Sequence, residues 1–392
     1  MNGTIRTYLK EYGGVSLKEM PLNDVDSLVL CQRASLMFDG LVPDVNENRM
    51  PVGIREIARL PGAERLFSDE RYKKVNLELF RSLCGSLRFG SMELNYYVNL
   101  IEKEWEAQFS AVTYFLDDGT VFVAFRGTDE TIVGWKEDFN MAFLSPVPSQ
   151  VCSEKYLNTV TERFTSPFFL GGHSKGGNLA IYSAMRSNEE VQKRIVKIYS
   201  MDGPGFRAGI LQKNGYEKIA DRVVKILPRS SVVGMLFEQE VPYRVVESTK
   251  LGIFQHNPYS WIVRENYLEE ADEIYRGRKL LDRAVNEWIL SLDREQLQRF
   301  VDTLFQILAA SETDNLIDFG NDKKKSFLGM ADAIRNLDPD TSRMMKEVLK
   351  ELFDIAGTNA LREINAKWPK QIIGNKKGRK RAKNERRKRE TE

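Results

Sequence analysis

The sequence predicts an α/β fold with a mainly parallel central sheet, followed by an all-helical region and a basic tail. Between about residues 107 and 247, short apolar runs alternate with helical stretches, as expected of βαβ units. After about residue 262 the strand-like runs stop, and apolar residues recur at helical spacing. From Lys376 to Glu392 the chain has ten Lys or Arg residues and three acids.

These changes in composition divide the chain of 392 residues, which is long enough for one large domain and a smaller one. We expect an α/β domain over residues 1–262, a helical region over 263–370 and a disordered basic tail over 371–392. The tail has a charge of +7 within a net charge of +2, so the remainder is mildly acidic. Such a tail is suited to an anionic membrane surface or to nucleic acid, although no aromatic residues are interleaved in it to favour nucleic acid.

Cysteine usage and hydropathy indicate where the protein works. Three cysteines lie far apart, forming neither a disulfide framework nor a metal-ligand cluster, which suits a reducing compartment. No apolar run approaches the roughly 18 residues of a membrane span, and the first thirty residues lack the layout of a secretory signal. We therefore expect a cytoplasmic protein.

The α/β region begins with a predicted β-hairpin over residues 107–126, which turns at Asp117-Asp118-Gly119. A helical pattern with apolar positions from Ile132 to Phe143 follows, and another lies near residues 151–163. The later strands are predicted at PFFLG, RIVKIYSM, RVVKIL and YRVVES, with a helix over NLAIYSAMRS.

Four amphipathic helices are predicted in the C-terminal region. The first has apolar positions over residues 280–289, and Asp293 with Gln296 resembles a capping box for the second. The other two lie near 325–336 and 342–356, the last ending at Gly357 as a C-cap.

The most informative stretch is PFFLGGHSKGGNLAIYSAM, in which an apolar strand runs into Gly172-His173-Ser174-Lys175-Gly176 and a helix begins at once. This strand–turn–helix setting is the one required of a G-x-S-x-G nucleophile elbow. We therefore predict an α/β-hydrolase fold with Ser174 as the nucleophile.

A serine nucleophile needs a base, and the chain contains only two histidines. His173 lies inside the elbow, where its ring is expected to point into packing. His256 follows the last predicted strand, where this fold places its base. We assign His256 as the base.

The acid is expected between the nucleophile and the base, at the end of a strand. Asp202 closes the first strand after the nucleophile helix, and Gly203-Pro204-Gly205 forms a turn that would expose it. Asp221 begins a strand, which is the wrong end. Weaker candidates are Glu238, Glu240 and Glu247. We assign Asp202 as the acid, with a turn-capping aspartate as the alternative.

Two backbone N–H groups are expected to bind the oxyanion. One is that of Lys175, the residue after the nucleophile, and the other is that of Thr128 in the segment AFRGTDET, with its hydroxyl as a possible additional donor. The side chain of Lys175 opposes the helix dipole. We expect it either to bend into solvent or to meet an anionic group of the substrate.

At these residues the sequence resembles the class 3, fungal-type lipases. FRGTDETIVGWKEDF is similar to their oxyanion segment, and GHSKGG to their GHSLGG elbow. The resemblance implies that Thr128 is the oxyanion residue, Ser174 the nucleophile and His256 the base. It also implies that residues 129–144 act as a lid, although their aromatic side chains suit buried core equally well.

Two departures separate the chain from those lipases. The elbow leucine is Lys175, and no carboxylate follows the strand RVVKIL, so Asp202 would act from the preceding strand as in pancreatic-type lipases. The segments DGPGF, PRSSVVG and QH together are similar to a bacterial group of lipase-3-like proteins, the domain-of-unknown-function family 2974.

The sequence therefore predicts a serine hydrolase that cleaves small-molecule or lipid acyl esters through an acyl-enzyme and needs no metal or organic cofactor. An acyltransferase or thioesterase would use the same residues. A third alternative is a non-catalytic scaffold that binds through its helical region and basic tail.

Overall fold

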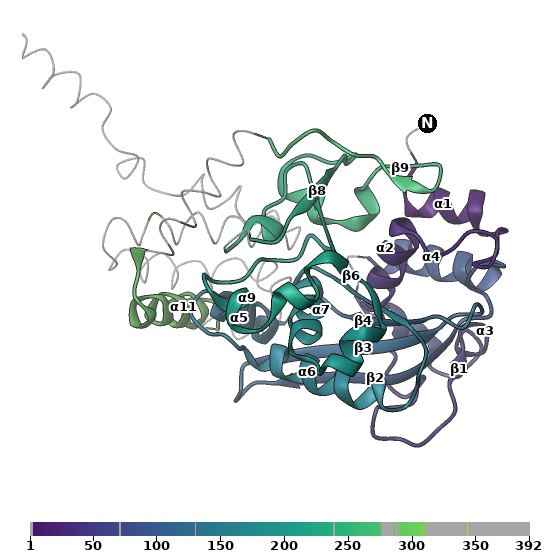
Figure 1. The fold of residues 1–392 in the computed structure, drawn as a ribbon, viewed down its shortest axis with the longest axis horizontal. Coiled ribbons are helices and arrows are strands. Elements are labelled where there is room, and N and C mark those ends of the chain that lie inside the picture. Colours follow the sequence, from purple (N-terminus) through teal and green to yellow (C-terminus); the bar gives the residue numbers. More distant parts are fainter. Residues whose placement is uncertain are drawn as a thin grey trace, which may run out of the picture.

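The computed structural model describes residues 3–69, 72–129, 131–237, 240–275 and 291–309, with the single positions 286, 289 and 343. Within these ranges, eight strands form one sheet in chain order (Figure 1). The strands are β1 (Val52–Gly53), β2 (Glu93–Glu102), β3 (Ala107–Phe115), β4 (Val121–Phe125), β5 (Phe168–His173), β6 (Ile195–Met201), β7 (Val223–Pro228) and β8 (Tyr243–Val246).

The type of strand pairing changes once across the sheet, at β4. The pairings from β1 to β4 are antiparallel, whereas the four from β4 to β8 are parallel. Parallel neighbours need crossover connections, which helices supply here. The predicted α/β fold with a mainly parallel central sheet is confirmed.

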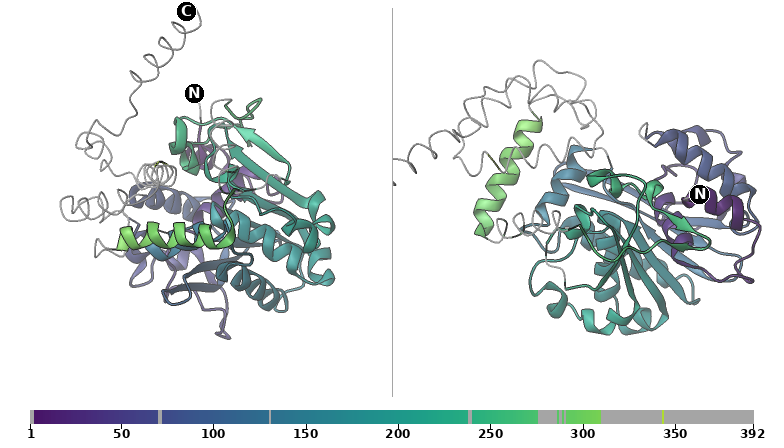
Figure 2. Two further views of the ribbon diagram at one scale, coloured as in Figure 1. Left: turned by 90° about the vertical axis from the view of Figure 1, so that its left-hand side faces the viewer. Right: turned by 90° about the horizontal axis from the view of Figure 1, so that it is seen from above.

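Helices cover both faces of the sheet (Figures 1 and 2). The helices α6 and α7 pack on one face, and α2 packs on the other. The α-helices are α1 (Ile5–Tyr12), α2 (Asp24–Arg33), α3 (Ile54–Ile57), α4 (Lys73–Gly85), α5 (Ile132–Asn140), α6 (Pro148–Thr161), α7 (Lys175–Arg186), α8 (Glu189–Arg194), α9 (Ile210–Lys213) and α11 (Arg294–Ala309).

The alternation of side chains along β4 creates two cores. Phe122 and Ala124 join the cluster under α1, α2 and α4, whereas Val121, Val123 and Phe125 join the cluster under α6 and α7. Successive side chains of a strand point to opposite faces, so β4 is buried on both sides.

Two parts of the fold add to the prediction. The predicted hairpin is present as β3 and β4, but β2 and β1 extend it outward. A short hairpin, β9 (Val263–Arg264) with β10 (Tyr267–Leu268), follows residue 262, where no strand was expected. Two-residue strands are too short to show an alternating pattern, which explains the omission.

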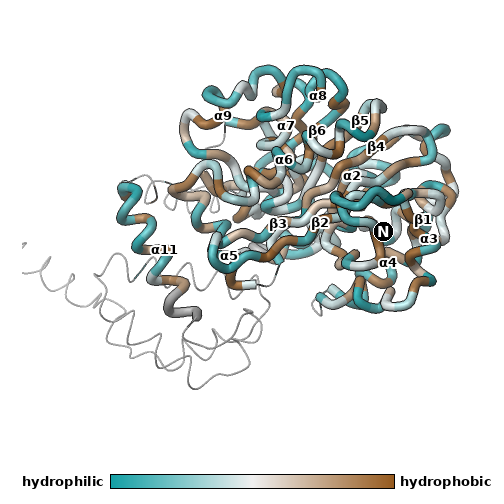
Figure 3. The backbone as a smooth tube through the Cα atoms, turned by 90° about the horizontal axis from the view of Figure 1, so that it is seen from below, coloured by the Kyte–Doolittle hydropathy of each residue, from teal (hydrophilic) through white to brown (hydrophobic). Residues whose placement is uncertain are grey.

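The described part of the C-terminal region is α11. Asp293 and Gln296 form the expected capping box, since each backbone N–H donates to the other side chain at 2.8 Å. Hydrophilic and hydrophobic residues alternate along α11 (Figure 3), and its apolar face is buried from Leu297 to Phe305. The helices predicted near 280–289, 325–336 and 342–356, and the tail from 371, lie outside the described residues apart from single positions.

Candidate active site

Thr128, Ser174 and Asp202 follow the carboxyl ends of the adjacent parallel strands β4, β5 and β6, whereas His256 ends a short helical turn after β8. In the sheet register, Phe125 of β4 lies beside Gly172 of β5, and His173 lies beside Met201 of β6. The residues that follow these strands therefore share one edge of the sheet, where α/β folds bind ligands.

Ser174 occupies the sharp turn between β5 and α7. Its backbone has φ 57° and ψ −133°, a conformation that L-residues rarely adopt. Its N–H donates to the Met201 carbonyl at 2.9 Å, which ties the turn to β6. The residue is only partly buried at this edge of the sheet.

The two glycines of the elbow are required by space. A Cβ on Gly172 would lie 2.2 Å from the carbonyl carbon of Gly176, and a Cβ on Gly176 would lie 2.2 Å from the Phe125 carbonyl oxygen. Real Cβ contacts are essentially never shorter than 3.0 Å. The G-x-S-x-G pattern thus reflects the close approach of β5 to α7 and of α7 to the end of β4.

Asp202 and His256 are brought together by the fold. His256 Nδ1 lies 2.6 Å from Asp202 Oδ2, although 54 positions separate the residues in sequence. Because a carboxylate only accepts, Nδ1 carries the proton and Nε2 is left as the basic nitrogen. Asp202 is fully buried and His256 is partly exposed.

The other oxygen of Asp202 is also occupied. Oδ1 accepts hydrogen bonds from the Ser231 hydroxyl and, at 3.2 Å, from the Gly234 N–H. Burial alone would raise the pKa of Asp202, but the hydrogen bond and charge of His256 and the hydrogen bond from Ser231 hold it below its ordinary value. Asp202 is therefore ionised at neutral pH.

The described alternative acids have other surroundings. Asp221 sits before β7 with its side chain 82% exposed. Glu240 is bonded to Gln212, and Glu247 pairs with Arg229 at 2.7 Å. Glu238 lies outside the described residues.

His173 packs against the other histidine. The two ring centroids are 4.5 Å apart, and His173 Nε2 lies 2.8 Å from the carbonyl oxygen of His256. Burial, with the nearby His256, lowers the pKa of His173 to about 3. The ring is therefore neutral and donates from Nε2 to the backbone of His256.

The loop after β4 meets the elbow directly. A Cβ on Gly127 would lie 3.1 Å from Ser174 Cβ, so the next residue, Thr128, begins close to the nucleophile. The Thr128 hydroxyl donates to Asp138 Oδ2 on α5. That bond leaves the Thr128 N–H, rather than its hydroxyl, as the donor available to a ligand.

Asp138 is half-buried, with its side chain 25% exposed. Burial raises its pKa to about 6, which the charge of Lys175 and the hydrogen bond from Thr128 only partly counteract. The carboxylate therefore changes charge in a mildly acidic range.

Both expectations for the Lys175 side chain are wrong. It reaches neither solvent nor a substrate position, because it is 1% exposed and its Nζ lies 2.8 Å from Glu137 Oε2 and from the Gln108 carbonyl oxygen. The cation at the start of α7 is compensated by this buried carboxylate. The partner is on α5, 38 positions away, which no local pattern reveals.

Residues 83–306, more than half of the chain, match the sequence profile of the Mbeg1-like family. The chain belongs to the Mbeg1-like family. No curated protein matches the sequence.

Three lipase structures show partial similarity to this Mbeg1-like chain. M37 lipase is 14% identical with a TM-score of 0.32, over 43% of this chain and 65% of its own. The native Rhizomucor miehei lipase propeptide complex is 17% identical with a TM-score of 0.30, over 41% and 57%. The lipase from Rhizopus microsporus var. chinensis is 15% identical with a TM-score of 0.31, over 52% and 72%. The chain thus spans less than two-thirds of the first two.

Several residues that support the Mbeg1-like site were not singled out from sequence. Ser231 and Gly234 bond Asp202, and the Gln255 side chain accepts from the Ser230 N–H at 2.6 Å. A Cβ on Gly234 would lie 2.4 Å from Asp202 Oδ1. The segments PRSSVVG and QH are those that the sequence shares with the lipase-3-like group. Only the fold shows that they meet around Asp202.

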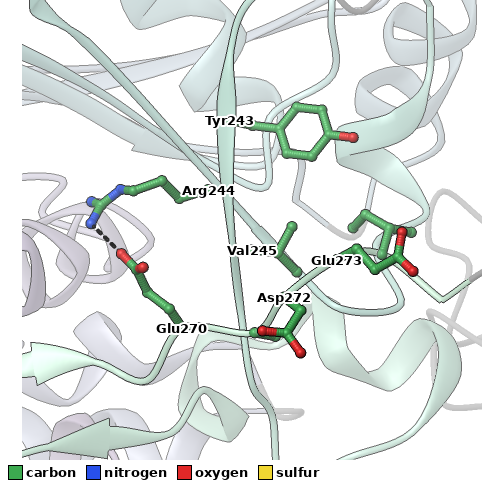
Figure 4. A pocket seen from close by; sticks show the side chains of 8 residues that line it. Tyr243, Arg244, Val245, Glu270, Asp272 and Glu273 are labelled. Atoms are coloured by element: carbon green, nitrogen blue, oxygen red, sulfur yellow. Dashed lines mark hydrogen bonds and ion pairs between the residues drawn. The ribbon is translucent and has the colours of Figure 1, made fainter.

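A separate hollow of about 390 Å³ lies beside β8 (Figure 4). Its described lining includes Arg244, which pairs with Glu270 at 3.0 Å, and further carboxylates at Asp272 and Glu273. Its described lining contains neither Ser174 nor His256. This polar hollow is distinct from the predicted site.

Two kinds of feature are absent from the described ranges. No group of three or more His, Cys, Asp or Glu side chains there could hold a metal ion. No helix there combines the length and hydrophobicity needed to cross a bilayer.

Proposed function

We propose that this Mbeg1-like protein is a serine hydrolase that cleaves carboxylic esters through Ser174, His256 and Asp202. The observation that carries the proposal is the 2.6 Å hydrogen bond between His256 and the buried Asp202, beside a serine in a strained turn. A strained backbone persists only where the surrounding structure enforces it, and such sites cluster at functional positions.

In the first half of the reaction, Ser174 Oγ attacks the ester carbonyl carbon while His256 Nε2 accepts its proton. Asp202 holds the imidazole in the required tautomer and stabilises the imidazolium that forms. The oxyanion is bound by the N–H groups of Lys175 and Thr128. Collapse of the tetrahedral intermediate breaks the bond to the alcohol oxygen, which takes the proton from His256.

In the second half, water attacks the acyl-enzyme and gives a proton to His256. The second tetrahedral intermediate then releases the carboxylic acid, and the proton returns to Ser174. An alcohol or thiol in place of water would make the protein an acyltransferase, so the product distinguishes the two reactions.

The test is hydrolysis of p-nitrophenyl esters of increasing acyl length by the full chain. Wild type is compared with Ser174→Ala and with Ser91→Ala, which changes an exposed serine before β2. We expect the released acid to be detected with wild type and Ser91→Ala and lost with Ser174→Ala. Equal turnover by Ser174→Ala would contradict the proposal, and so would no turnover of any ester by folded wild type.

The remaining sequence-based assignments stay predictions. They are the division into domains, the cytoplasmic location, the resemblance to domain-of-unknown-function family 2974 and binding of the tail to an anionic membrane or nucleic acid. Residues 371–392 lie outside the described part of the chain. A scaffold function is disfavoured by the Asp202–His256 pair, because a binding surface needs no ordered imidazole.

A further inference from the structure

The helix α5 lies in the segment for which the lipase resemblance implies a lid. Hydrogen bonds and an ion pair nevertheless hold its N-terminus in place. Asp129 Oδ1 accepts from the backbone N–H and the hydroxyl of Thr131 at 2.9 and 2.5 Å, and Asp129 Oδ2 pairs with Arg126 at 3.3 Å. The Thr131 hydroxyl then caps the helix by accepting from the Gly134 N–H. The entry to α5 is therefore tied to the end of β4.

The later part of α5 is fixed by a buried carboxylate. Glu137 is 0% exposed and accepts hydrogen bonds from Lys175 Nζ at 2.8 Å, from the Gln108 N–H at 3.0 Å and from the Ser149 N–H at 2.7 Å. One side chain thus joins α5 to β3, to α6 and to the first residue of α7. Moving α5 away would leave the buried charges of Lys175 and Glu137 unpaired, which is strongly unfavourable.

The outer side of α5 is covered by α11 (Figures 1 and 2). Phe139 packs edge-to-face against Phe305 with ring centroids 5.6 Å apart. Lys136 bridges Asp302 of α11 at 2.9 Å and Glu106 at 2.6 Å. Contacts from both sides therefore hold α5.

The position of α5 matters for chemistry because Asp138 follows Glu137 directly. Asp138 accepts the hydrogen bond from the Thr128 hydroxyl. Fixing Glu137 therefore fixes Asp138, and Asp138 in turn orients the residue proposed to bind the oxyanion.

We propose that Lys175 and Glu137 are positioning residues that hold α5 and keep Thr128 permanently oriented for oxyanion binding. The site is then assembled in water, and its substrates are dissolved esters rather than esters that must be presented on a lipid surface. An apolar residue at position 175, as in the lipases that the sequence resembles, could not form this ion pair. The inference rests on the proposed function.

The test measures labelling of the full chain by a fluorophosphonate, with and without phosphatidylcholine vesicles. The main variant is Lys175→Leu with Glu137→Ala. It removes both charges of the ion pair together, so that neither buried charge is left without its partner. The matched control is Arg186→Leu with Glu154→Ala, an ion pair of α7 that does not involve α5. Circular dichroism and thermal melting establish that each variant is folded.

Vesicles are expected to leave wild-type labelling unchanged. In the Lys175/Glu137 variant, the maximal labelling rate should fall about a hundredfold, as when a reacting group is misplaced by about 1 Å. The half-saturating probe concentration should stay the same, because probe binding does not need the oxyanion donors. The Arg186/Glu154 control should behave as wild type.

Two outcomes would overturn the positioning role. One is wild type that labels many times faster on vesicles than in solution, and the other is a folded Lys175/Glu137 variant that labels as fast as wild type. Folded wild type that is labelled under neither condition would contradict the proposed function itself, and the positioning role with it.

Discussion

Asp202 holds the imidazole of His256 through one carboxylate oxygen while Ser231 and Gly234 hold the other oxygen. Three segments of the chain thus converge on one fully buried carboxylate. Its first role is to fix the tautomer of His256, and this role makes the acid the most informative position to change.

Asp202→Asn is expected to leave the fold intact and to slow fluorophosphonate labelling by about ten-thousandfold, the effect of losing the correct histidine tautomer in serine proteases. The amide keeps the size of the side chain, but only its oxygen accepts hydrogen bonds, whereas the carboxylate of Asp202 accepts through both oxygens. The labelling rate constant measures the effect. Asp221→Asn, at the exposed amino end of β7, is the control and should label at the wild-type rate.

Thr128→Val removes the hydrogen bond to Asp138 but keeps the shape of the side chain and its N–H. The loop after β4 then loses its tie to α5, so we expect labelling to slow by about a hundredfold, as when an oxyanion donor is lost. Thr128→Ser should retain most of the rate. Thr120→Val, at the residue before β4, is the control and should label at the wild-type rate. Equal labelling rates for Thr128→Val and wild type would exclude a role for the Thr128 hydroxyl.

Gly176→Ala is expected to destabilise the protein by about 3 kcal/mol or more. The added Cβ would lie 2.2 Å from the Phe125 carbonyl oxygen, a backbone atom that cannot move aside cheaply. Urea unfolding measures the loss. At Gly85, near the end of α4, an added Cβ meets nothing within 4 Å, so Gly85→Ala should instead stabilise by about 0.5 kcal/mol.

His173 makes stability depend on pH. Its pKa is lowered to about 3 in the folded chain from an ordinary 6.5, so the unfolded chain binds the extra proton between these values. The free energy of unfolding should therefore fall as pH drops below 6.5, by about 2 kcal/mol between pH 7 and pH 5 from this residue.

His173→Gln keeps a donor for the His256 carbonyl but cannot titrate. Urea unfolding at pH 7 and pH 5 should show a smaller loss of stability in this variant than in wild type. A loss of equal size in both proteins would show that His173 does not stay neutral in the fold.

The sequence was sufficient to predict the features that depend on local backbone constraints. The elbow at Ser174 needs glycines at fixed spacing, and the βαβ alternation follows from short apolar runs, so both are visible in the residues. Asp202 and His256 could be chosen because each follows a predicted strand. The chain held only two histidines, which reduced the choice further.

What the sequence could not provide was contact between distant segments. Lys175 looked like a surface or ligand-facing cation because its partner Glu137 comes from a different helix. The supporting bonds of Ser231 and Gly234 depend on how the loop after β7 folds over Asp202. The short strands β1, β9 and β10 carry too few residues for any period to emerge.

Whether Ser174 is an activated nucleophile can be decided by peptide mapping with mass spectrometry after reaction with a fluorophosphonate. We predict one phosphonate ester, formed with loss of fluoride, on the peptide that contains Ser174, and no adduct in Ser174→Ala. An adduct on a different residue, or none on folded wild type, would contradict it.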